Sequence, residues 1–520
     1  MMGDFFRPAW VVFFLSLVVY LVFLCPDVAW DDSGEFITAG LCLGVPHAPG
    51  SPLLVILAKI LTLLPVGSVA FRVNLLSALA TSVSASLLCV LLGQMIRPDG
   101  NRGATVVVLS LAWAVSPWVM RHALAAEVYG LAWMCLLAAF LLAEEYQRRD
   151  CCGPCSLYVL WGFLAGIGVS TSALLAPFAL FLCVVPFVDR RGFWVPASRL
   201  LGGLILGLLP LGAPWLRSFS APPIFYSDAD TVSGLGRYLL GRQYERLMLG
   251  SAGQFDLQAW LWAGVGLLVL GTLLSRSPRP RRVWWITGIG ALNLSFVALQ
   301  RHPGQFFVPW LCSALLLAAV SWPTKAGRTV AVWCLLAAGF WSSQTALQTQ
   351  DLPLRWTERS TRALPGSSVA FLGEINAVFP VLYSRVVQHE PPELTLYPIW
   401  NSTRSQHLQT VQAATGAVFV DMDLVDFAKR TGQAGVFSDI VPDPVLLRVH
   451  RPDSLNWEMW WDSEREWLRR NQPHMTRLDR LILGKHYFNL GVFCLEHNIP
   501  IGETLLGIAR GLNPELPKIE

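Results

Sequence analysis

Apolar segments long enough to cross a membrane recur through the first two thirds of the chain, and they restrict its fold more than any other feature. A helix needs about 20 mostly apolar residues to span the hydrocarbon layer of a bilayer. Eleven segments reach or approach that length, near residues 8–25, 73–96, 103–120, 128–143, 157–171, 173–188, 198–216, 258–275, 283–300, 306–322 and 329–345. They predict a polytopic α-helical membrane protein with about 11 transmembrane helices.

Charged residues divide the chain near residue 345. Residues 1–345 hold 22 Lys and Arg and 15 Asp and Glu, whereas the much shorter remainder holds 17 and 20. We therefore predict a membrane domain over 1–345, a small soluble α/β domain over 346–450 and a helical region over 451–520. The whole chain is only 14% charged, which excludes one large soluble enzyme, a disordered chain and a disulfide-rich scaffold.

Basic residues predict the orientation, because cytoplasmic loops are enriched in Lys and Arg. With the N-terminus in the cytoplasm, 14 of the 22 basic residues of the membrane domain fall in inside segments. This places the first outside loop, residues 26–72, and the tail on the outer or lumenal side. The apolar segment 51–64 within that loop is too short to span, so we expect an interfacial helix there.

The balance of Arg and Lys bears on the organism and therefore on the membrane in which the protein resides. Arg greatly outnumbers Lys, and the sequence shows no obvious eukaryotic targeting signal. We therefore favour a bacterial inner membrane, with the endoplasmic reticulum membrane as the alternative for a eukaryotic source.

The first outside loop gathers acidic residues at the expected membrane edge. Its acidic residues are Asp27, Asp31, Asp32 and Glu35. Like charges packed this closely repel one another, so the cluster suits a general base, a metal site or the recognition of sugar hydroxyls. The alternative is a solvated loop in which Asp31 or Asp32 caps a helix running through residues 36–43.

Three sequence motifs distinguish this region from an ordinary loop between membrane spans. They are D-S-G-E-F-I-T-A-G from Asp32, L-G-V-P-H-A-P-G-S-P-L from Leu43 and A-F-R-V-N-L-L-S-A from Ala70. Together they resemble the N-terminal signature of a GT-C superfamily group of integral-membrane glycosyltransferases. That group includes the animal transmembrane protein O-mannosyltransferase acting on plexin-type receptors and its bacterial relatives. The usual H-P-P-G-Y-P differs here, because Ala48 and Ser51 replace the second residue and the Tyr.

The resemblance implies a GT-C-type fold and transfer of a sugar from a polyprenyl-phosphate donor to an acceptor hydroxyl. Mannose and a protein Ser or Thr are the expected sugar and acceptor. Asp32 is the expected general base, and Glu35 a second acid that orients it or the sugar. The expected substrate contacts are His47, Arg72, Arg121, His122, Glu127, Tyr129, Asp228, Arg237, Tyr244, Arg301 and Gln305.

Other interpretations stay open at this stage. Each Arg taken alone equally suits a side chain that reaches from the membrane edge to water. No cofactor is certain, and the sequence does not decide whether a divalent cation takes part. Expected partners are the polyprenyl-phosphate sugar, an acceptor protein or glycan and membrane lipid, and no basic stripe indicates nucleic acid. The rival functions are a polytopic lipid or sugar transporter or flippase and a non-catalytic membrane scaffold.

The tail shows two patterns. Apolar runs at 369–373, 394–397 and 417–421 predict strands, and helices are expected near 377–389, 404–414 and 423–431. Residues 475–515 follow a tetratricopeptide-type (TPR-like) helical hairpin, which must bury its apolar face against a neighbour. We expect it to pack on the α/β part.

Overall fold

The structure of the protein is a computed structural model. It describes residues 3–95, 102–148, 155–172, 194–220, 222–226, 231–240, 352–362, 368–372, 375–389, 394–398, 404–413, 417–433, 441–442, 447–449, 457–496 and 498–514, with residues 179, 183, 435 and 516.

The chain divides into two compact units. Unit 1 comprises Met1–Leu24, Ala39–Val66 and Arg72–Ser343. Unit 2 comprises Cys25–Thr38, Gly67–Phe71 and Gln344–Glu520. The start of the first outside loop is thus counted with the C-terminal part of the chain.

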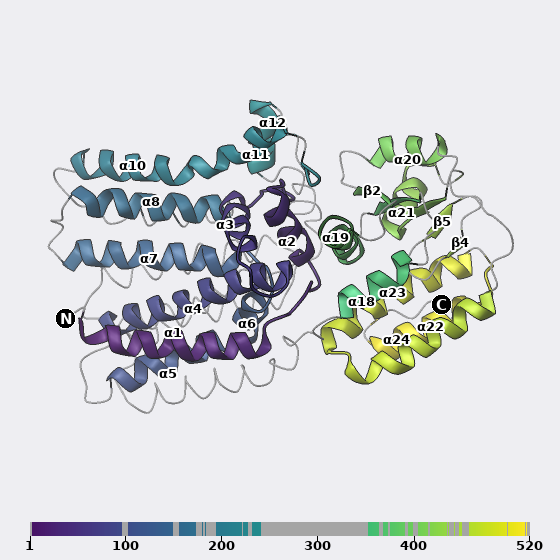
Figure 1. The fold of residues 1–520 in the computed structure, drawn as a ribbon, viewed down its shortest axis with the longest axis horizontal. Coiled ribbons are helices and arrows are strands. Elements are labelled where there is room, and N and C mark those ends of the chain that lie inside the picture. Colours follow the sequence, from purple (N-terminus) through teal and green to yellow (C-terminus); the bar gives the residue numbers. More distant parts are fainter. Residues whose placement is uncertain are drawn as a thin grey trace, which may run out of the picture. The chain divides into compact units, whose positions relative to one another are not determined.

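Unit 1 is helical. Its described helices are α1 (Gly3–Phe23), α3 (Pro52–Thr62), α4 (Val69–Met95), α5 (Arg102–Ala114), α6 (Pro117–Ala123), α7 (Tyr129–Arg148), α8 (Cys155–Thr171), α10 (Trp194–Leu208), η3 (Leu209–Gly212), α11 (Ala213–Ser218) and α12 (Val232–Leu239). Helix α2 (Ser33–Cys42) precedes α3. In the described part of the chain, three stretches are long and apolar enough to cross a membrane: Val69–Gln94, Tyr129–Tyr146 and Ala197–Ser218. Figure 1 shows α7, α8 and α10 stacked side by side.

Helices α8 and α10 pack closely because glycines face each other. A Cβ on Gly162 would lie 2.0 Å from the carbonyl oxygen of Leu200, and one on Gly203 would lie 2.1 Å from that of Val159. Gly166 and Gly207 repeat this arrangement four residues along each helix. Small residues at this spacing allow helix backbones to approach closely where lipid replaces water as the solvent.

The predicted span 103–120 is interrupted, which corrects the sequence analysis, whereas the span 198–216 contains a short 3₁₀ turn but remains long and apolar enough to cross a membrane. The segment 103–120 is broken between α5 and α6, because Ser116 is extended before Pro117. The segment 198–216 passes from α10 through the short 3₁₀ turn η3, which contains Pro210, into α11. Helices are present at the predicted spans 8–25, 73–96, 128–143 and 157–171, and α3 matches the short helix expected at 51–64. The predicted spans 258–275, 283–300, 306–322 and 329–345 and nearly all of 173–188 lie outside the described residues.

Unit 2 contains a five-stranded mixed sheet in the order β2-β1-β3-β5-β4. The strands are β1 (Val369–Leu372), β2 (Thr395–Pro398), β3 (Val418–Val420), β4 (Val441–Pro442) and β5 (Leu447–Val449). The central strand β1 pairs in parallel with β2 and β3, while β5 runs antiparallel to β3 and β4. The three predicted strands are confirmed, and the short β4–β5 pair was not predicted.

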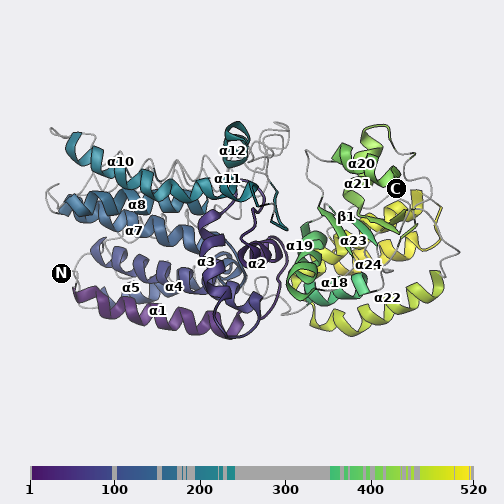
Figure 2. The same cartoon turned by 45° about the horizontal axis from the view of Figure 1, so that its top comes forward.

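The helices of unit 2 share one hydrophobic core with the sheet. They are α18 (Leu352–Arg362), α19 (Ile375–Tyr383) with the π-helical turn η6 (Ser384–Gln388), α20 (Arg404–Ala413), α21 (Met422–Arg430), α22 (Trp457–Asn471), η8 (Gln472–His474), α23 (Arg477–Glu496) and α24 (Gly502–Leu512). Phe371 of β1 and Val418 of β3 belong to the same buried cluster as Tyr487 of α23 and Leu505 of α24. The expected packing of the C-terminal hairpin on the α/β part is therefore confirmed. Figure 2 shows α20 on the opposite side of the strands from α22, α23 and α24.

Candidate active site

The first outside loop turns sharply into α2 at its acidic residues. Asp31 has a φ of 63°, a left-handed conformation that Asp tolerates better than most residues. The next residue, Asp32, accepts the first helical hydrogen bond through its carbonyl oxygen, 3.0 Å from the Phe36 nitrogen. Helix α2 therefore begins directly after Asp32, and Glu35 lies in its first turn.

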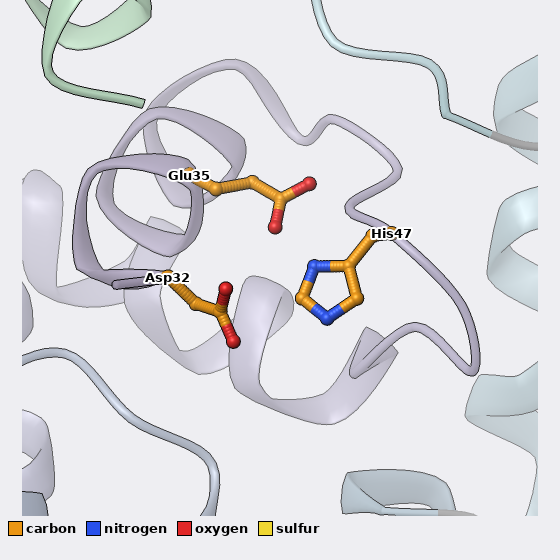
Figure 3. Close-up of side chains that lie close together, drawn as sticks. All are labelled: Asp32, Glu35 and His47. Carbon is orange, nitrogen blue, oxygen red and sulfur yellow. The ribbon is translucent and has the colours of Figure 1, made fainter. Parts of the chain in front are cut away.

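Asp32, Glu35 and His47 form a compact group of side chains. One carboxylate oxygen from each acid and one imidazole nitrogen all lie within 4.8 Å of one another. Figure 3 shows the three side chains pointing toward one another from α2 and the loop that follows it. Glu35 is fully buried, whereas Asp32 and His47 are half-buried and remain accessible to a substrate. Two carboxylates and an imidazole in this geometry can accept a proton, orient a hydroxyl or hold a divalent cation.

The loop that carries His47 is held by a distant segment of unit 1. Val45 forms a short parallel bridge with Phe225: the Val45 nitrogen donates to the Ile224 oxygen at 2.8 Å, and the Tyr226 nitrogen donates to the Val45 oxygen at 3.0 Å. The buried Tyr238 hydroxyl of α12 donates to the carbonyl oxygen of Pro46 at 2.6 Å. His47 thus follows a backbone that is fixed at two consecutive residues.

Arg217 and Gly50 complete this attachment. The Arg217 guanidinium donates to the carbonyl oxygens of Leu43 at 2.7 Å and Cys42 at 3.2 Å, which satisfies acceptors at the C-terminal end of α2. Gly50 has a φ of 65°, and a Cβ there would lie 2.3 Å from the Tyr238 hydroxyl. The glycine is therefore required both by the backbone conformation and by the packing of Tyr238.

A second group of predicted residues, His122, Glu127 and Tyr129, lies together in unit 1. The His122 Nδ1 atom is 3.9 Å from Glu127 Oε1, and the His122 and Tyr129 ring centroids are 4.4 Å apart. Ser77 of α4 fixes the Glu127 backbone, accepting from its nitrogen at 3.0 Å and donating to its oxygen at 3.1 Å. Burial, aided by the positive charge of Arg121, lowers the pKa of His122 to about 3. At neutral pH the imidazole is uncharged, so the approach to Glu127 is not a salt bridge.

The remaining predicted contacts are scattered or outside the described residues. Arg72, in the first turn of α4, donates to the carbonyl oxygens of Thr62 and Leu64 at the end of α3. Arg121 is half-buried on α6 beside His122, and Arg237 is exposed on α12. The other predicted contacts, Asp228, Tyr244, Arg301 and Gln305, lie outside the described residues.

The sequence did not identify Arg217 and Tyr238. Both lie between the predicted spans 198–216 and 258–275, in the segment that supplies the predicted contacts Asp228, Arg237 and Tyr244. The Tyr238 bond joins residues 192 positions apart, and the Arg217 bonds join residues 174 and 175 apart. No local pattern marks a bond of that kind. The available signal was the position of Tyr238, which follows the predicted contact Arg237 between two predicted spans.

Known proteins resemble this chain at two levels. Residues 32–191 match the family model described as the protein O-mannosyl-transferase TMEM260 N-terminal domain. Protein O-mannosyl-transferase TMEM260 of Mus musculus is 30% identical over 187 residues, which are 36% of this chain and 26% of that protein. The chain thus spans about a quarter of the length of this curated relative.

The fold is also found among solved structures. ArnT from Cupriavidus metallidurans, crystallised with undecaprenyl phosphate, superposes with a TM-score of 0.51 at 14% sequence identity. The superposition covers 85% of this chain and 97% of that one. At this identity the likeness establishes a shared polytopic helical fold.

Proposed function

We propose that the protein is a membrane glycosyltransferase, because residues 32–191 match the family model described as the protein O-mannosyl-transferase TMEM260 N-terminal domain. Its donor is a sugar, of the mannose type, on a polyprenyl phosphate. Its acceptor is a hydroxyl group, in the first instance Ser or Thr of a protein. The observation that carries the proposal is the group formed by Asp32, Glu35 and His47 inside the matched region.

The geometry supports a role for each residue of this group. Asp32 is accessible and takes the proton from the acceptor hydroxyl as its oxygen forms a bond to the anomeric carbon. The bond between that carbon and the phosphate oxygen breaks at the same time, and polyprenyl phosphate leaves with the electron pair. Buried Glu35 and half-buried His47 orient Asp32 and the sugar hydroxyls, because both reach the same point from a rigid backbone.

A divalent cation fits the same three side chains. Carboxylate oxygens with one imidazole are ligands that Mn²⁺ and related ions accept, and the atoms are close enough to share one ion. Such an ion would neutralise charge on the departing phosphate. In that case Asp32 would act as a ligand, and activity would be lost on treatment with a chelator and restored by the metal.

The second group supports binding of the donor. Tyr129 presents an aromatic ring beside neutral His122, and Arg121 adjoins them on α6. An Arg near an aromatic surface suits a phosphate bonded to a sugar. We assign donor contact to these residues with Glu127, Arg72 and Arg237, and to Asp228, Tyr244, Arg301 and Gln305.

ArnT was crystallised with undecaprenyl phosphate, which supports a lipid-linked donor for this protein. We propose about 11 transmembrane helices, a cytoplasmic N-terminus and an outer or lumenal tail, in a bacterial inner membrane. The domains we propose are 1–345, 346–450 and 451–520. We propose that the last of these is a TPR-like region.

The test uses the full-length protein in lipid nanodiscs with radiolabelled mannosyl phosphopolyprenol. The acceptors are envelope proteins from cells that lack the gene, identified afterwards by mass spectrometry. Asp32→Asn should lower kcat by about 10²- to 10⁴-fold, because the amide cannot accept the proton. Asp27→Asn, in the same loop, is the matched control and should keep wild-type activity.

Two results would contradict the proposal. Wild-type kcat in the Asp32→Asn variant would remove Asp32 as base and as cation ligand. No transfer from any polyprenyl-phosphate sugar by the wild-type protein, together with movement of labelled lipid across the bilayer, would favour the transporter alternative.

A further inference from the structure

Trp30 stands two residues before Asp32, yet its side chain is part of the core of unit 2. It is 1% exposed and belongs to the same buried cluster as Phe371 of β1 and Tyr487 of α23. Its ring packs against that of Trp356 in α18, with centroids 5.7 Å apart and planes at 64°. The start of the acidic loop is therefore built into the C-terminal part of the chain.

The indole nitrogen of Trp30 is bonded to a buried charge. It donates to Asp479 Oδ1 at 2.7 Å, and Asp479 is fully buried in the first turn of α23. The other carboxylate oxygen, Oδ2, accepts from the Thr476 nitrogen at 2.8 Å and from its hydroxyl at 2.6 Å. This capping arrangement holds the carboxylate rigidly, so that Oδ1 offers Trp30 a fixed acceptor.

The backbone on each side of Asp32 is fixed as well. The Asp31 nitrogen donates to Asn376 Oδ1 of α19 at 3.0 Å, which steadies the residue with left-handed φ. On the other side, a Cβ on Gly34 would lie 2.6 Å from the Phe379 carbonyl oxygen, so α2 begins in direct contact with α19. Asp32 thus lies between two attachments to residues more than 300 positions away in the sequence.

We infer that Asp479 and Asn376 are positioning residues for the acidic group: through Trp30 and Asp31 they fix the place of Asp32. We call these four residues the Trp30 anchor. The inference rests on the proposed function where it names Asp32 as the reacting acid, while the anchor itself rests on the contacts alone. It gives Asp479 and Asn376 of the C-terminal region a positioning role, because a displacement of about 1 Å at a reacting group costs on the order of 10²-fold in rate.

The experiment uses the full-length chain in nanodiscs and separates kcat from KM. Trp30→Phe keeps an aromatic ring in the core and removes the donor, and Asp479→Ala removes the acceptor. Each should lower kcat by roughly 10- to 100-fold and leave the KM for the lipid-linked donor within about twofold. Asp479→Asn keeps one acceptor oxygen, but its amide nitrogen then faces either the Trp30 indole or the Thr476 nitrogen, so it should restore kcat only in part. The Trp30→Phe, Asp479→Ala double variant should be no slower than the slower single variant, because both changes break one bond.

Tyr487→Phe is the matched control. Tyr487 is buried in the same cluster and donates to Glu464, away from the acidic loop. Its variant should lower the thermal unfolding midpoint and leave kcat unchanged. If Tyr487→Phe lowers kcat as much as Trp30→Phe at an equal loss of stability, the Trp30 anchor supports stability alone and the inference fails.

Hydrogen exchange gives a measurement that needs no transferase activity. Trp30→Phe should speed exchange of the amides of residues 31–36 on the order of tenfold, with α4 unchanged. If exchange responds and the wild-type protein transfers no sugar, the anchor stands and the proposed function fails. If neither exchange nor kcat responds, the anchor fails and the proposed function is unaffected.

Discussion

Two segments carry the acidic group, and they are attached to the rest of the chain in different ways. We call the loop with His47 the His47 end and the segment with Asp32 the Asp32 end. At the His47 end, Tyr238 and Arg217 of unit 1 bind main-chain carbonyl oxygens of Pro46 and Leu43. At the Asp32 end, a whole side chain, Trp30, enters the core of unit 2 and bonds to buried Asp479. The first attachment is spread over several hydrogen bonds to main-chain atoms, including those donated by the Arg217 guanidinium. The second combines one buried bond between side chains, Trp30 to Asp479, with the bond from the Asp31 nitrogen to Asn376.

The residues of the acidic group and the residues that hold them in place lie in different parts of the sequence. The matched family region, residues 32–191, contains Asp32, Glu35 and His47 but none of the partners that hold the two ends. Residues 217–238 lie beyond its C-terminal limit, as do Asn376 and Asp479. The match therefore covers the three residues of the proposed site but not the residues that hold them in place.

The largest effect is expected at Glu35, the buried acid of the group. Glu35→Gln keeps the shape of this buried side chain and removes its charge from the group. We expect kcat to fall by about 10²-fold, because the amide can neither hold a cation nor polarise Asp32. The measurement is steady-state transfer from mannosyl phosphopolyprenol. Glu503→Gln, exposed in the first turn of α24, is the control, and an equal loss in both variants would contradict the role of Glu35.

A substitution at Gly34 tests how the Asp32 end is held without removing a polar group. Gly34→Ala forces a Cβ to within 2.6 Å of the Phe379 oxygen, so α2 must move. We expect a loss of roughly 10- to 100-fold in kcat with little change in KM. Gly236→Ala in α12 is the matched control, since a Cβ there meets no atom within 4 Å, and the change should be neutral or slightly stabilising. Wild-type kcat in Gly34→Ala would show that the position of α2 on α19 does not set the site.

The sequence predicts some elements of the fold and fails to predict others. The membrane spans and three strands were predictable because long apolar runs and short apolar strands have few alternative structures. The break at Pro117 was missed because apolar residues continue through it, and the β4–β5 pair was missed because strands of two and three residues show no alternation.

The sequence singles out the acidic residues of the candidate site, whereas the residues that hold them in place carry no local signal. Asp32 and Glu35 stood out as charges crowded at a membrane edge within a recognisable motif. Trp30 looked like an ordinary aromatic residue, because its bond to Asp479 spans 449 positions. Asn376 is a polar residue shortly after a strand, and nothing in the local sequence indicates that its side chain accepts a hydrogen bond from the Asp31 nitrogen, 345 positions away.

The His47 end should be less sensitive to the loss of one bond. Tyr238→Phe removes the hydroxyl that donates to Pro46, while the two main-chain bonds of Val45 remain. A neutral hydrogen bond contributes about 0.5–1.5 kcal/mol, so we expect kcat to fall by about threefold to tenfold. The comparison is made with Trp30→Phe in the same assay. A greater loss in Tyr238→Phe would reverse the order proposed for the two ends.

The smallest expected effect concerns stability at low pH, and it comes from the buried side chain of His122. Burial lowers the pKa of folded His122 to about 3, against about 6.5 in the unfolded chain. The unfolded state then binds the proton first, so stability is full above pH 6.5 and declines as the pH falls from 6.5 toward 3. By pH 5 the loss is about 2 kcal/mol. His122→Gln cannot take up this proton, so its thermal unfolding midpoint should change less between pH 7 and 5, and parallel midpoints would show that His122 is not the group responsible.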